Sequence, residues 1–207
     1  MDSIIFDLDG TLWDSTKNLH EVWNETFYKY GLGKPFSNRD VPKYMGATTE
    51  DFVNDMPHDI PIEERFKIAE ESWNSEIPYL SKHGGILYDD VENTLKVLSE
   101  KYKLFIVSNC MEGYIQAFFS AHGLEKYFCD IEYIGRTGLE KSENIKLIIK
   151  RNNLHSPVYV GDTQRDMLSS KEAGIPFIFA AYGFGESKDY LAKIDKFSEL
   201  PLILEKI

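Results

Sequence analysis

The chain begins with a short apolar run that ends abruptly in acidic residues. Ser3 to Phe6 is followed by Asp7-Leu8-Asp9-Gly10-Thr11-Leu12. A short run of β-branched and aromatic residues is typical of a buried strand, and open α/β sheets bind ligands at the carboxyl ends of their strands. We therefore expect Asp7 and Asp9 at such an end, although an Asp-Gly pair by itself is also a common turn signal.

Helical periodicity dominates the chain after this strand. Apolar residues recur at three- and four-residue steps in the stretches 15–30, 48–56 and 62–77, which predicts three amphipathic helices. Thr48 or Thr49 is suited to cap the second helix, and Pro78 is expected to end the third. No strand is expected from Asp14 to Lys82.

After Gly84 the pattern alternates between helix and strand. Further strands are expected at 103–107, 130–134, 158–160 and 177–180, with helices near 91–102, 115–122, 142–152 and 163–173 and a short helix in the tail. Such alternation predicts an α/β fold with a doubly wound, mainly parallel sheet and helices on both faces. We expect a core of residues 1–13 and 84–207, with residues 14–83 inserted as a helical cap domain.

Composition and charge narrow the classes of partner. The chain has 207 residues, 43% of them hydrophobic, with 34 acidic and 23 basic side chains and a net charge of −11. This balance opposes general attraction to nucleic acids and anionic membranes. The sequence contains no apolar run of about 18 residues, so we expect a soluble cytoplasmic protein without nucleic-acid or membrane partners. Its oligomeric state, monomer or homodimer, stays open.

Polar side chains follow three of the expected strands. They are Asp7 and Asp9 after the first, Ser108 and Asn109 after the second, and Asp162 after a later one. Parallel strands bring these ends to one edge of the sheet. Asp166 lies one helical turn beyond Asp162, and Lys141 precedes another helix. Together these residues offer carboxylates to a divalent cation, a hydroxyl and amides to phosphate oxygens, and an ammonium to developing negative charge.

The segments FDLDGTL, VSN, a following lysine and VGDTQRD stand in this order with an intervening helical block. This arrangement resembles the haloacid dehalogenase superfamily, in its phosphatase branch with a helical cap, and most of all the phosphoglycolate phosphatase group. The resemblance spans residues 1–13 and about 84–181. It implies a Rossmann-like core, Mg²⁺ as cofactor and a small phosphorylated metabolite as substrate.

The resemblance also implies a role for each motif residue. Asp7 would be the nucleophile that forms an aspartyl-phosphate, and Asp9 would be the general acid and base. Ser108 and the Asn109 backbone amide would bind the transferring phosphoryl group, whose charge Lys141 would neutralise. The expected Mg²⁺ ligands are Asp7, the Asp9 carbonyl oxygen, Asp162 and Asp166.

Further contacts are expected around this centre. Gly10 would allow a tight turn beside the phosphate, and Thr11 would orient Asp9. Lys43 and Tyr44 lie in a segment that resembles the substrate-facing loop of the cap, so they are candidate substrate contacts. Thr49 stands where related phosphomutases carry an arginine for a second phosphate, which favours simple hydrolysis.

Three alternatives stay open at this point. Lys141 is followed by Ser142, whereas family phosphatases often have proline there, so Lys146 remains a second candidate for the active-site lysine. A phosphomutase of the same family is the nearest competing enzyme. A member that binds a phosphorylated ligand without turnover is the alternative from another functional class.

Overall fold

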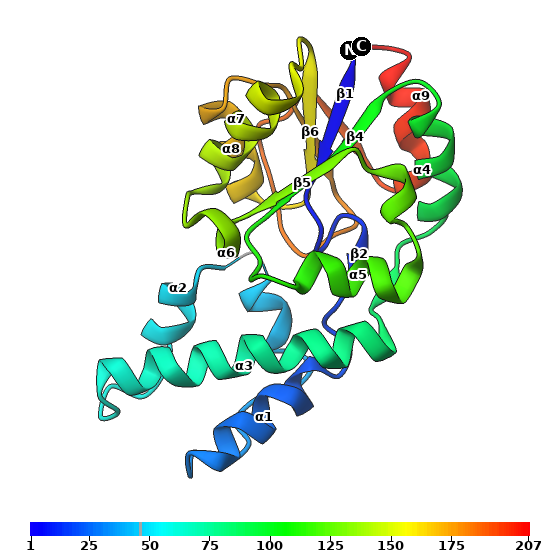
Figure 1. The fold of residues 1–207 in the computed structure, drawn as a ribbon. Helices are drawn as coiled ribbons and strands as arrows, with labels where there is room; N and C mark the ends of the chain where they lie inside the picture. Colours follow the sequence, from blue (N-terminus) through cyan, green and yellow to red (C-terminus); the bar gives the residue numbers. More distant parts are fainter. Residues whose placement is uncertain (46) are drawn as a thin grey trace.

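The computed structural model describes residues 1–45 and 47–207, and its centre is a six-stranded sheet (Figure 1). The strands are β1 (Ser3–Phe6), β4 (Lys103–Ser108), β5 (Asp130–Tyr133), β6 (Pro157–Gly161), β7 (Phe177–Ala180) and β8 (Ala192–Ile194). Their order is β5-β4-β1-β6-β7-β8, and all neighbouring pairs are parallel. The predicted α/β fold with a mainly parallel sheet is confirmed.

Strand β1 lies at the middle of the sheet because it is apolar on both faces. All four of its residues are buried, and it pairs with β4 on one side and with β6 on the other. Side chains alternate between the two faces of a strand. Accordingly Ile5 belongs to one apolar cluster, whereas Ile4 and Phe6 belong to the other. A strand buried in this way carries the residues after it to a fixed place at the sheet edge.

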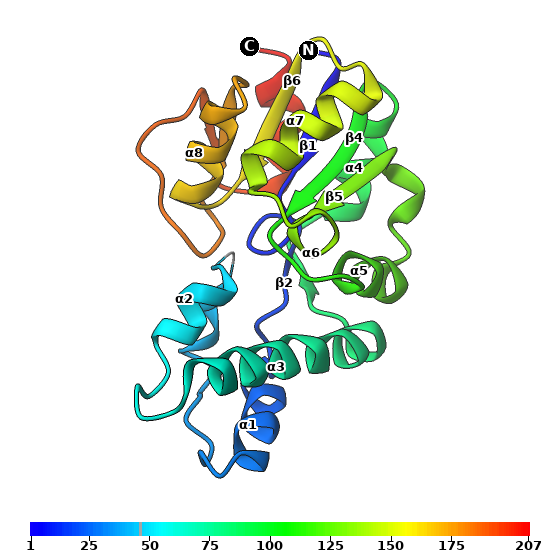
Figure 2. The same ribbon diagram turned by 60° about the vertical axis from the view of Figure 1, so that its left-hand side comes forward.

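Helices cover both faces of the sheet, with α7 and α8 on one side and α4 and α9 on the other (Figure 2). The core helices are α4 (Val91–Ser99), α5 (Tyr114–His122), α6 (Ile134–Thr137), α7 (Lys141–Asn152), α8 (Gln164–Glu172) and α9 (Leu200–Leu204), with 3₁₀ turns η2 (Glu125–Tyr127) and η3 (Phe197–Glu199). Both chain ends lie at the side of the core away from the strands' carboxyl ends. The carboxyl edge therefore faces the inserted helices.

Residues 14–83, here termed the helical insertion, lie below that edge (Figure 1). The insertion contains α1 (Leu19–Lys29), the 3₁₀ turn η1 (Val41–Tyr44), α2 (Thr49–Asn54) and α3 (Ile62–His83). Aromatic rings hold it together: Trp23 contacts Phe52 with ring centroids 5.4 Å apart, and Phe52 contacts Trp73 at 4.5 Å. The Trp23–Phe52 pair is edge-to-face, and such pairs stabilise beyond the area they bury.

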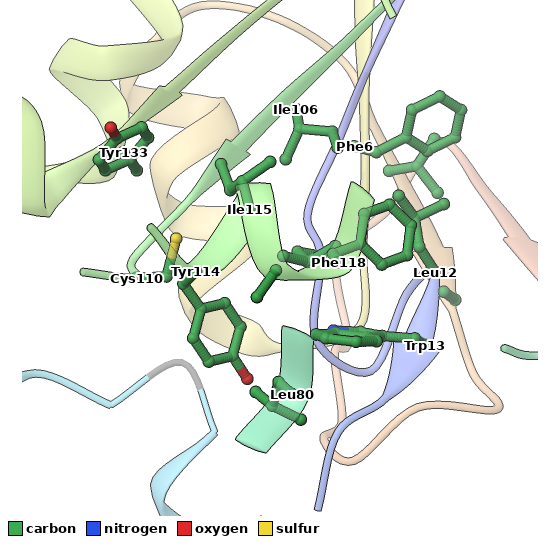
Figure 3. Packing of buried hydrophobic residues seen from close by; sticks show 14 of the residues in the cluster. Phe6, Leu12, Trp13, Leu80, Ile106, Cys110, Tyr114, Ile115, Phe118 and Tyr133 are labelled. Carbon is green, nitrogen blue, oxygen red and sulfur yellow. The ribbon is translucent and has the colours of Figure 1, made fainter. Parts of the chain in front are cut away.

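An apolar cluster joins the insertion to the core (Figure 3). The Trp13 ring packs edge-on against Phe118 and Tyr114 of α5, at centroid distances of 5.0 and 5.9 Å. Leu80, near the end of α3, is fully buried in the same cluster. The long helix α3 is thus fixed against α5, and its side chains reach the edge of the sheet.

The first helix of the insertion begins later than its periodicity predicted. It starts at Leu19 rather than at Ser15. The Ser15 hydroxyl donates to Asp9, while the Thr16 backbone N–H and hydroxyl both donate to the Asp14 carboxylate. Such side-chain hydrogen bonds compete with helix formation, so the segment before Leu19 forms a turn instead. In the second helix Thr48 is the N-cap, as predicted, with Asp51 completing a capping box.

The prediction that Pro78 ends the third helix is wrong. Helix α3 continues through Pro78 to His83. Proline removes one backbone donor and crowds the preceding turn, but the buried side chains on both sides of it, Glu76 and Leu80, keep the helix in place. Tertiary packing therefore outweighs the local cost.

The prediction of no strand from Asp14 to Lys82 is also wrong at its first residue. Trp13–Asp14 form β2, which pairs antiparallel with β3 (Ile86–Leu87) where the chain leaves the core and returns to it. A Cβ atom on Gly85 would lie 2.6 Å from the Asp14 carbonyl oxygen, so glycine is needed there. Strands of two residues are too short to produce a recognisable period. The boundaries of the other predicted elements agree within a few residues, and β3, α6 and β8 were not predicted.

Candidate active site

Three buried carboxylates and one buried ammonium lie together at the carboxyl edge of the sheet. The Lys141 Nζ atom lies 2.9 Å from Asp7 Oδ1 and 2.7 Å from Asp166 Oδ1. Asp7 follows β1, Asp166 lies in the first turn of α8, and Lys141 begins α7. Burial alone would lower the pKa of Lys141, but Asp166 and Asp7 outweigh it and raise that pKa well above its usual value.

This group has the donor set of a hard divalent cation. Carboxylate oxygens of Asp7, Asp162 and Asp166 lie within 4.8 Å of one another. Three carboxylates against one ammonium leave two negative charges when all are ionised. Burial and then repulsion from Asp166 raise the pKa of Asp7 to about 7, and the same two causes raise the pKa of Asp162 well above its usual value. Oxygen ligands and uncompensated double negative charge fit Mg²⁺.

Backbone groups and glycines hold Asp162 and Asp166 in this arrangement. Phe184 N–H donates to Asp162 Oδ2 at 2.7 Å, and the Thr163 hydroxyl donates to Asp166 Oδ2 at 2.6 Å in a capping box. A Cβ atom on Gly10, which has a φ of 78°, would lie 2.1 Å from Asp162 Oδ2. Gly10 therefore serves both the expected turn and the close approach of Asp162.

Thr11 has a different partner from the one expected. Its hydroxyl donates to Asp162 Oδ1 at 3.4 Å, and no hydrogen bond to Asp9 is found in the part of the chain that the structure describes. The expectation that Thr11 orients Asp9 is therefore corrected. Thr11 is fully buried, so its hydroxyl needs a partner within the protein, and Asp162 supplies it.

Three other donors fix Asp9. Trp13 Nε1, Ser15 Oγ and Tyr114 OH donate to Asp9 Oδ1 at 2.8, 2.5 and 3.0 Å. Burial raises the pKa of Asp9 to about 6, although all three donors favour the ionised carboxylate and act in the opposite direction. Asp9 thus has a different environment from Asp7. Asp7 belongs to the cluster of three acids, whereas Asp9 is hydrogen-bonded to side chains where the insertion meets the core.

The remaining motif residues lie where the sequence placed them. Ser108 is the last residue of β4 and is buried, and Asn109 follows it at the same edge. Lys146, the alternative lysine, is exposed and pairs with Glu143 at 2.6 Å. Lys141 is therefore the lysine that the structure brings to Asp7.

Comparisons with known proteins agree with this geometry. Residues 4–180 match the family described as haloacid dehalogenase-like hydrolase. The chain belongs to this family. It is 28% identical over 187 residues to a phosphoglycolate phosphatase of Aquifex aeolicus, with 87% of this chain and 85% of that protein covered.

Other relatives show the same pattern. A phosphoglycolate phosphatase of Escherichia coli K12 is 26% identical, with 90% of this chain and 84% of that protein covered. The solved structure of a haloacid dehalogenase-like hydrolase from Streptococcus pneumoniae has a TM-score of 0.84 at 24% identity, covering 99% of this chain and 98% of the other. The predicted membership of this hydrolase family, with similarity to phosphoglycolate phosphatases, is confirmed.

A cavity of about 400 Å³ opens beside Asp9, between the insertion and the core. Its walls come from both parts: Asp9, Asn109, Cys110, Met111, Tyr114, Ile134, Gly135 and Gly138 from the core, and Tyr44, Met45, Ala47, Thr48, Thr49, Glu50, Trp73 and Glu76 from the insertion. A volume of this size is usual for small-molecule sites. The cavity therefore offers space for a small molecule next to Asp9.

The two candidate contacts of the insertion lie in different places. Tyr44 lines the cavity, and its hydroxyl donates to Asp55 at 3.1 Å. Lys43 is 63% exposed, pairs with Asp55 at 2.5 Å and lines a second hollow of about 350 Å³ beside Arg165. Contact of either residue with substrate stays a prediction. Among the described residues, no helix is long and apolar enough to cross a membrane.

Sequence reasoning missed four residues of this site. Trp13, Ser15 and Tyr114 carry the donors to Asp9, and Glu76 lines the cavity. No periodicity could have shown the first three, because their role depends on where α5 and the β2 segment meet. Glu76 did leave a signal: it is an acid three residues from Trp73 on the apolar stripe of α3.

Proposed function

We propose that the protein is a Mg²⁺-dependent phosphatase that hydrolyses a small phosphomonoester through an aspartyl-phosphate on Asp7. The observation that carries this proposal is the buried group of Asp7, Asp162, Asp166 and Lys141, which combines an oxygen nucleophile with a cation site. The names of the relatives, phosphoglycolate phosphatases, support a phosphomonoester as the substrate class.

In the first step a carboxylate oxygen of Asp7 attacks phosphorus as the bond from phosphorus to the substrate's alcohol oxygen breaks. Asp9 gives its proton to the departing oxygen, so the alcohol leaves neutral. A pKa of Asp9 near 6 leaves a protonated fraction at neutral pH. Ser108 and the Asn109 amide bind the phosphoryl oxygens, and Lys141 balances the charge shared by Asp7 and the phosphoryl group.

In the second step a water molecule attacks the phosphorus of the aspartyl-phosphate, and Asp9 accepts the proton of that water. The bond between phosphorus and the Asp7 oxygen breaks, which releases phosphate and restores the carboxylate. A mixed anhydride is more reactive than an alkyl phosphate, so one difficult displacement is divided into two easier ones.

Asp7, the Asp9 carbonyl oxygen, Asp162 and Asp166 would hold the Mg²⁺ ion. When bound, the ion supplies positive charge to the phosphoryl oxygens and to the crowded carboxylates. This agrees with the raised pKa values of Asp7 and Asp162, since a nearby cation favours their ionised forms. Asp7 must be ionised to act as a nucleophile.

Hydrolysis of p-nitrophenyl phosphate tests the proposal. We expect release of nitrophenol with Mg²⁺ and its loss with excess chelator, restored by added Mg²⁺. Asp7→Asn should lower kcat by at least about 10⁴-fold, while Asp89→Asn, an exposed acid of the core, serves as the matched control. Absence of metal-dependent release at high enzyme concentration would contradict turnover and favour a protein that only binds a phosphorylated ligand.

A further inference from the structure

The cavity beside Asp9 has acidic and aromatic walls. Two carboxylates of the insertion, Glu50 of α2 and Glu76 of α3, line it together with Asp9. None of the described residues that line it is a lysine, an arginine or a histidine. A leaving group that occupies this space therefore meets carboxyl groups and no described cationic side chain.

Glu76 is the most enclosed of these acids. Its side chain is 4% exposed, and Trp23 Nε1 donates to its Oε1 atom at 2.5 Å. Burial raises the pKa of Glu76 well above its usual value, and the charge of Asp9 acts in the same direction. A buried carboxyl is costly unless a partner compensates its charge. A positively charged ligand group would supply that partner.

Aromatic rings surround the same space. Tyr44, Trp73 and Tyr114 all line the cavity. Trp73 is fixed by Phe52, at a centroid distance of 4.5 Å, and by Trp23 at 5.3 Å. Ring faces attract ammonium groups, most strongly when water is excluded. Fixed rings beside a buried carboxyl are thus complementary to a cation with apolar substituents.

Three cations at the acidic cluster and at the second hollow have acidic partners. Lys141 pairs with Asp7 and Asp166 on the phosphate side. Arg165 and Lys43 pair with Asp51 and Asp55 and lie at the second hollow instead of in the cavity wall. An anionic leaving group would therefore find no described side chain in the cavity to balance its charge.

We infer that the cavity binds an ammonium group of the substrate, so that the leaving group is an amino alcohol or a larger amine, with its nitrogen beside Glu76 and the rings of Tyr44, Trp73 and Tyr114. The inference rests on the proposed phosphatase function and names the substrate class of that site. It separates this chain from the relatives named after phosphoglycolate, whose leaving group carries a carboxylate.

Three two-carbon phosphomonoesters test it, because they differ mainly in the terminal group. Phosphoethanolamine ends in an ammonium, 2-hydroxyethyl phosphate in a hydroxyl and phosphoglycolate in a carboxylate. We expect kcat/KM to fall in that order, with at least about a hundredfold between the ammonium and carboxylate esters. Calorimetric titration of the three esters into the Asp7→Asn variant with Mg²⁺ should give the same order of affinities.

Glu76→Gln identifies the residue responsible. The amide keeps the shape and can still accept from Trp23, but it loses the charge. We expect the ratio of kcat/KM for the ammonium ester to that for the hydroxyl ester to fall at least about tenfold. Glu70→Gln, an exposed glutamate on the same helix, should leave this ratio at the wild-type value.

The outcomes separate this inference from the proposed function. Metal-dependent hydrolysis of p-nitrophenyl phosphate together with a preference for the carboxylate or hydroxyl ester would overturn the ammonium site and leave the phosphatase intact. An ammonium preference that survives Glu76→Gln would overturn the role of Glu76. If neither p-nitrophenyl phosphate nor any of the three esters is hydrolysed, both proposals are wrong.

Discussion

At the core end of the site three buried carboxylates lie together with one ammonium, whereas at the insertion end a single buried carboxyl lies among aromatic rings. At the core end Lys141 compensates one of the three carboxylates, and the two negative charges that remain fit one divalent cation. The charge of Glu76 has only an indole N–H as its described partner. Under the proposed function, the core end would bind the phosphoryl group common to all substrates, while the insertion end would bind one leaving group.

The largest expected effect on activity comes from removing the ammonium of Lys141 at the core end. Lys141→Met leaves the three carboxylates and the phosphoryl group without their internal cation, so we expect kcat to fall by about 10²- to 10³-fold. Lys146→Met is the matched control, since Lys146 is exposed and pairs only with Glu143 among the described residues. Steady-state kinetics at saturating Mg²⁺ measures both. Equal effects of the two substitutions would contradict the assignment of Lys141.

The position of Asp9 between the two ends is tested by Tyr114→Phe. Because the Tyr114 hydroxyl donates to Asp9, its loss should raise the pKa of Asp9 further and lower kcat/KM about tenfold. Asp9 must be protonated to donate to the leaving group, so the alkaline limb of the kcat/KM profile should move to higher pH. Tyr133→Phe alters another buried tyrosine near this edge as a control. A profile unchanged in both variants would show that Tyr114 does not position Asp9.

The unbalanced charge at the insertion end should appear in the pH dependence of stability. Burial raises the pKa of Glu76 above its unfolded value, so the stabilisation belongs to the protonated form and is lost as pH rises through the folded pKa. The charge of Asp9 raises the pKa of Glu76 in the same direction as burial does, whereas the Trp23 indole N–H acts in the opposite direction.

Thermal unfolding of the wild type and of the Glu76→Gln variant, without ligand at pH 5 and pH 8, measures this loss of stability. In the Glu76→Gln variant, residue 76 cannot ionise. The Tm of the variant minus the Tm of the wild type should therefore be a few degrees higher at pH 8 than at pH 5. Asp7 and Asp162 also have raised pKa values, but they are present in both proteins and cancel in the difference. A constant difference in Tm would mean that Glu76 keeps the same charge state in the folded and unfolded protein.

The smallest effect on KM is expected at the surface where the insertion meets the core. Arg165 of α8 pairs with Asp51 of α2 at 2.8 Å, and both side chains are about half exposed. Exposed pairs contribute roughly 0.2–1 kcal/mol, so Arg165→Gln should raise KM at most a few-fold, and less at high salt. The control is Lys171→Gln, which breaks an exposed ion pair with Asp189, a pair whose two partners both lie outside the insertion. This substitution should not change KM. A large loss of kcat would contradict this minor role.

The sequence predicted the core end better than the insertion end because the core end is encoded locally. Asp7, Ser108 and Asp162 each come directly after or at the end of an apolar run, and parallel pairing then brings the three strand ends to one edge. The same locality explains the successful Thr48 cap, whose partner Asp51 lies three residues away. Features that depend on neighbours in the chain could therefore be deduced without the structure.

The missed features depend on contacts between distant segments. Tyr114 reaches Asp9 across 105 positions, and Trp23 reaches Glu76 across 53. Pro78 wrongly predicts a helix end because its local cost is visible in the sequence, whereas the packing of Leu80 that sustains the helix is not. Distant packing thus decided both the ends of the inserted helices and the chemistry of the cavity.

Chemical capture of the phosphorylated enzyme tests the central claim most directly. The enzyme is mixed with substrate and Mg²⁺, quenched in acid during turnover and reduced with borohydride, which converts an acyl-phosphate aspartate into homoserine. Mass spectrometry of the N-terminal peptide should find homoserine in place of Asp7 only when substrate is present, with Asp9 unchanged. Turnover without any modification at position 7, or modification at Asp9 or Asp162 instead, would contradict Asp7 as the nucleophile.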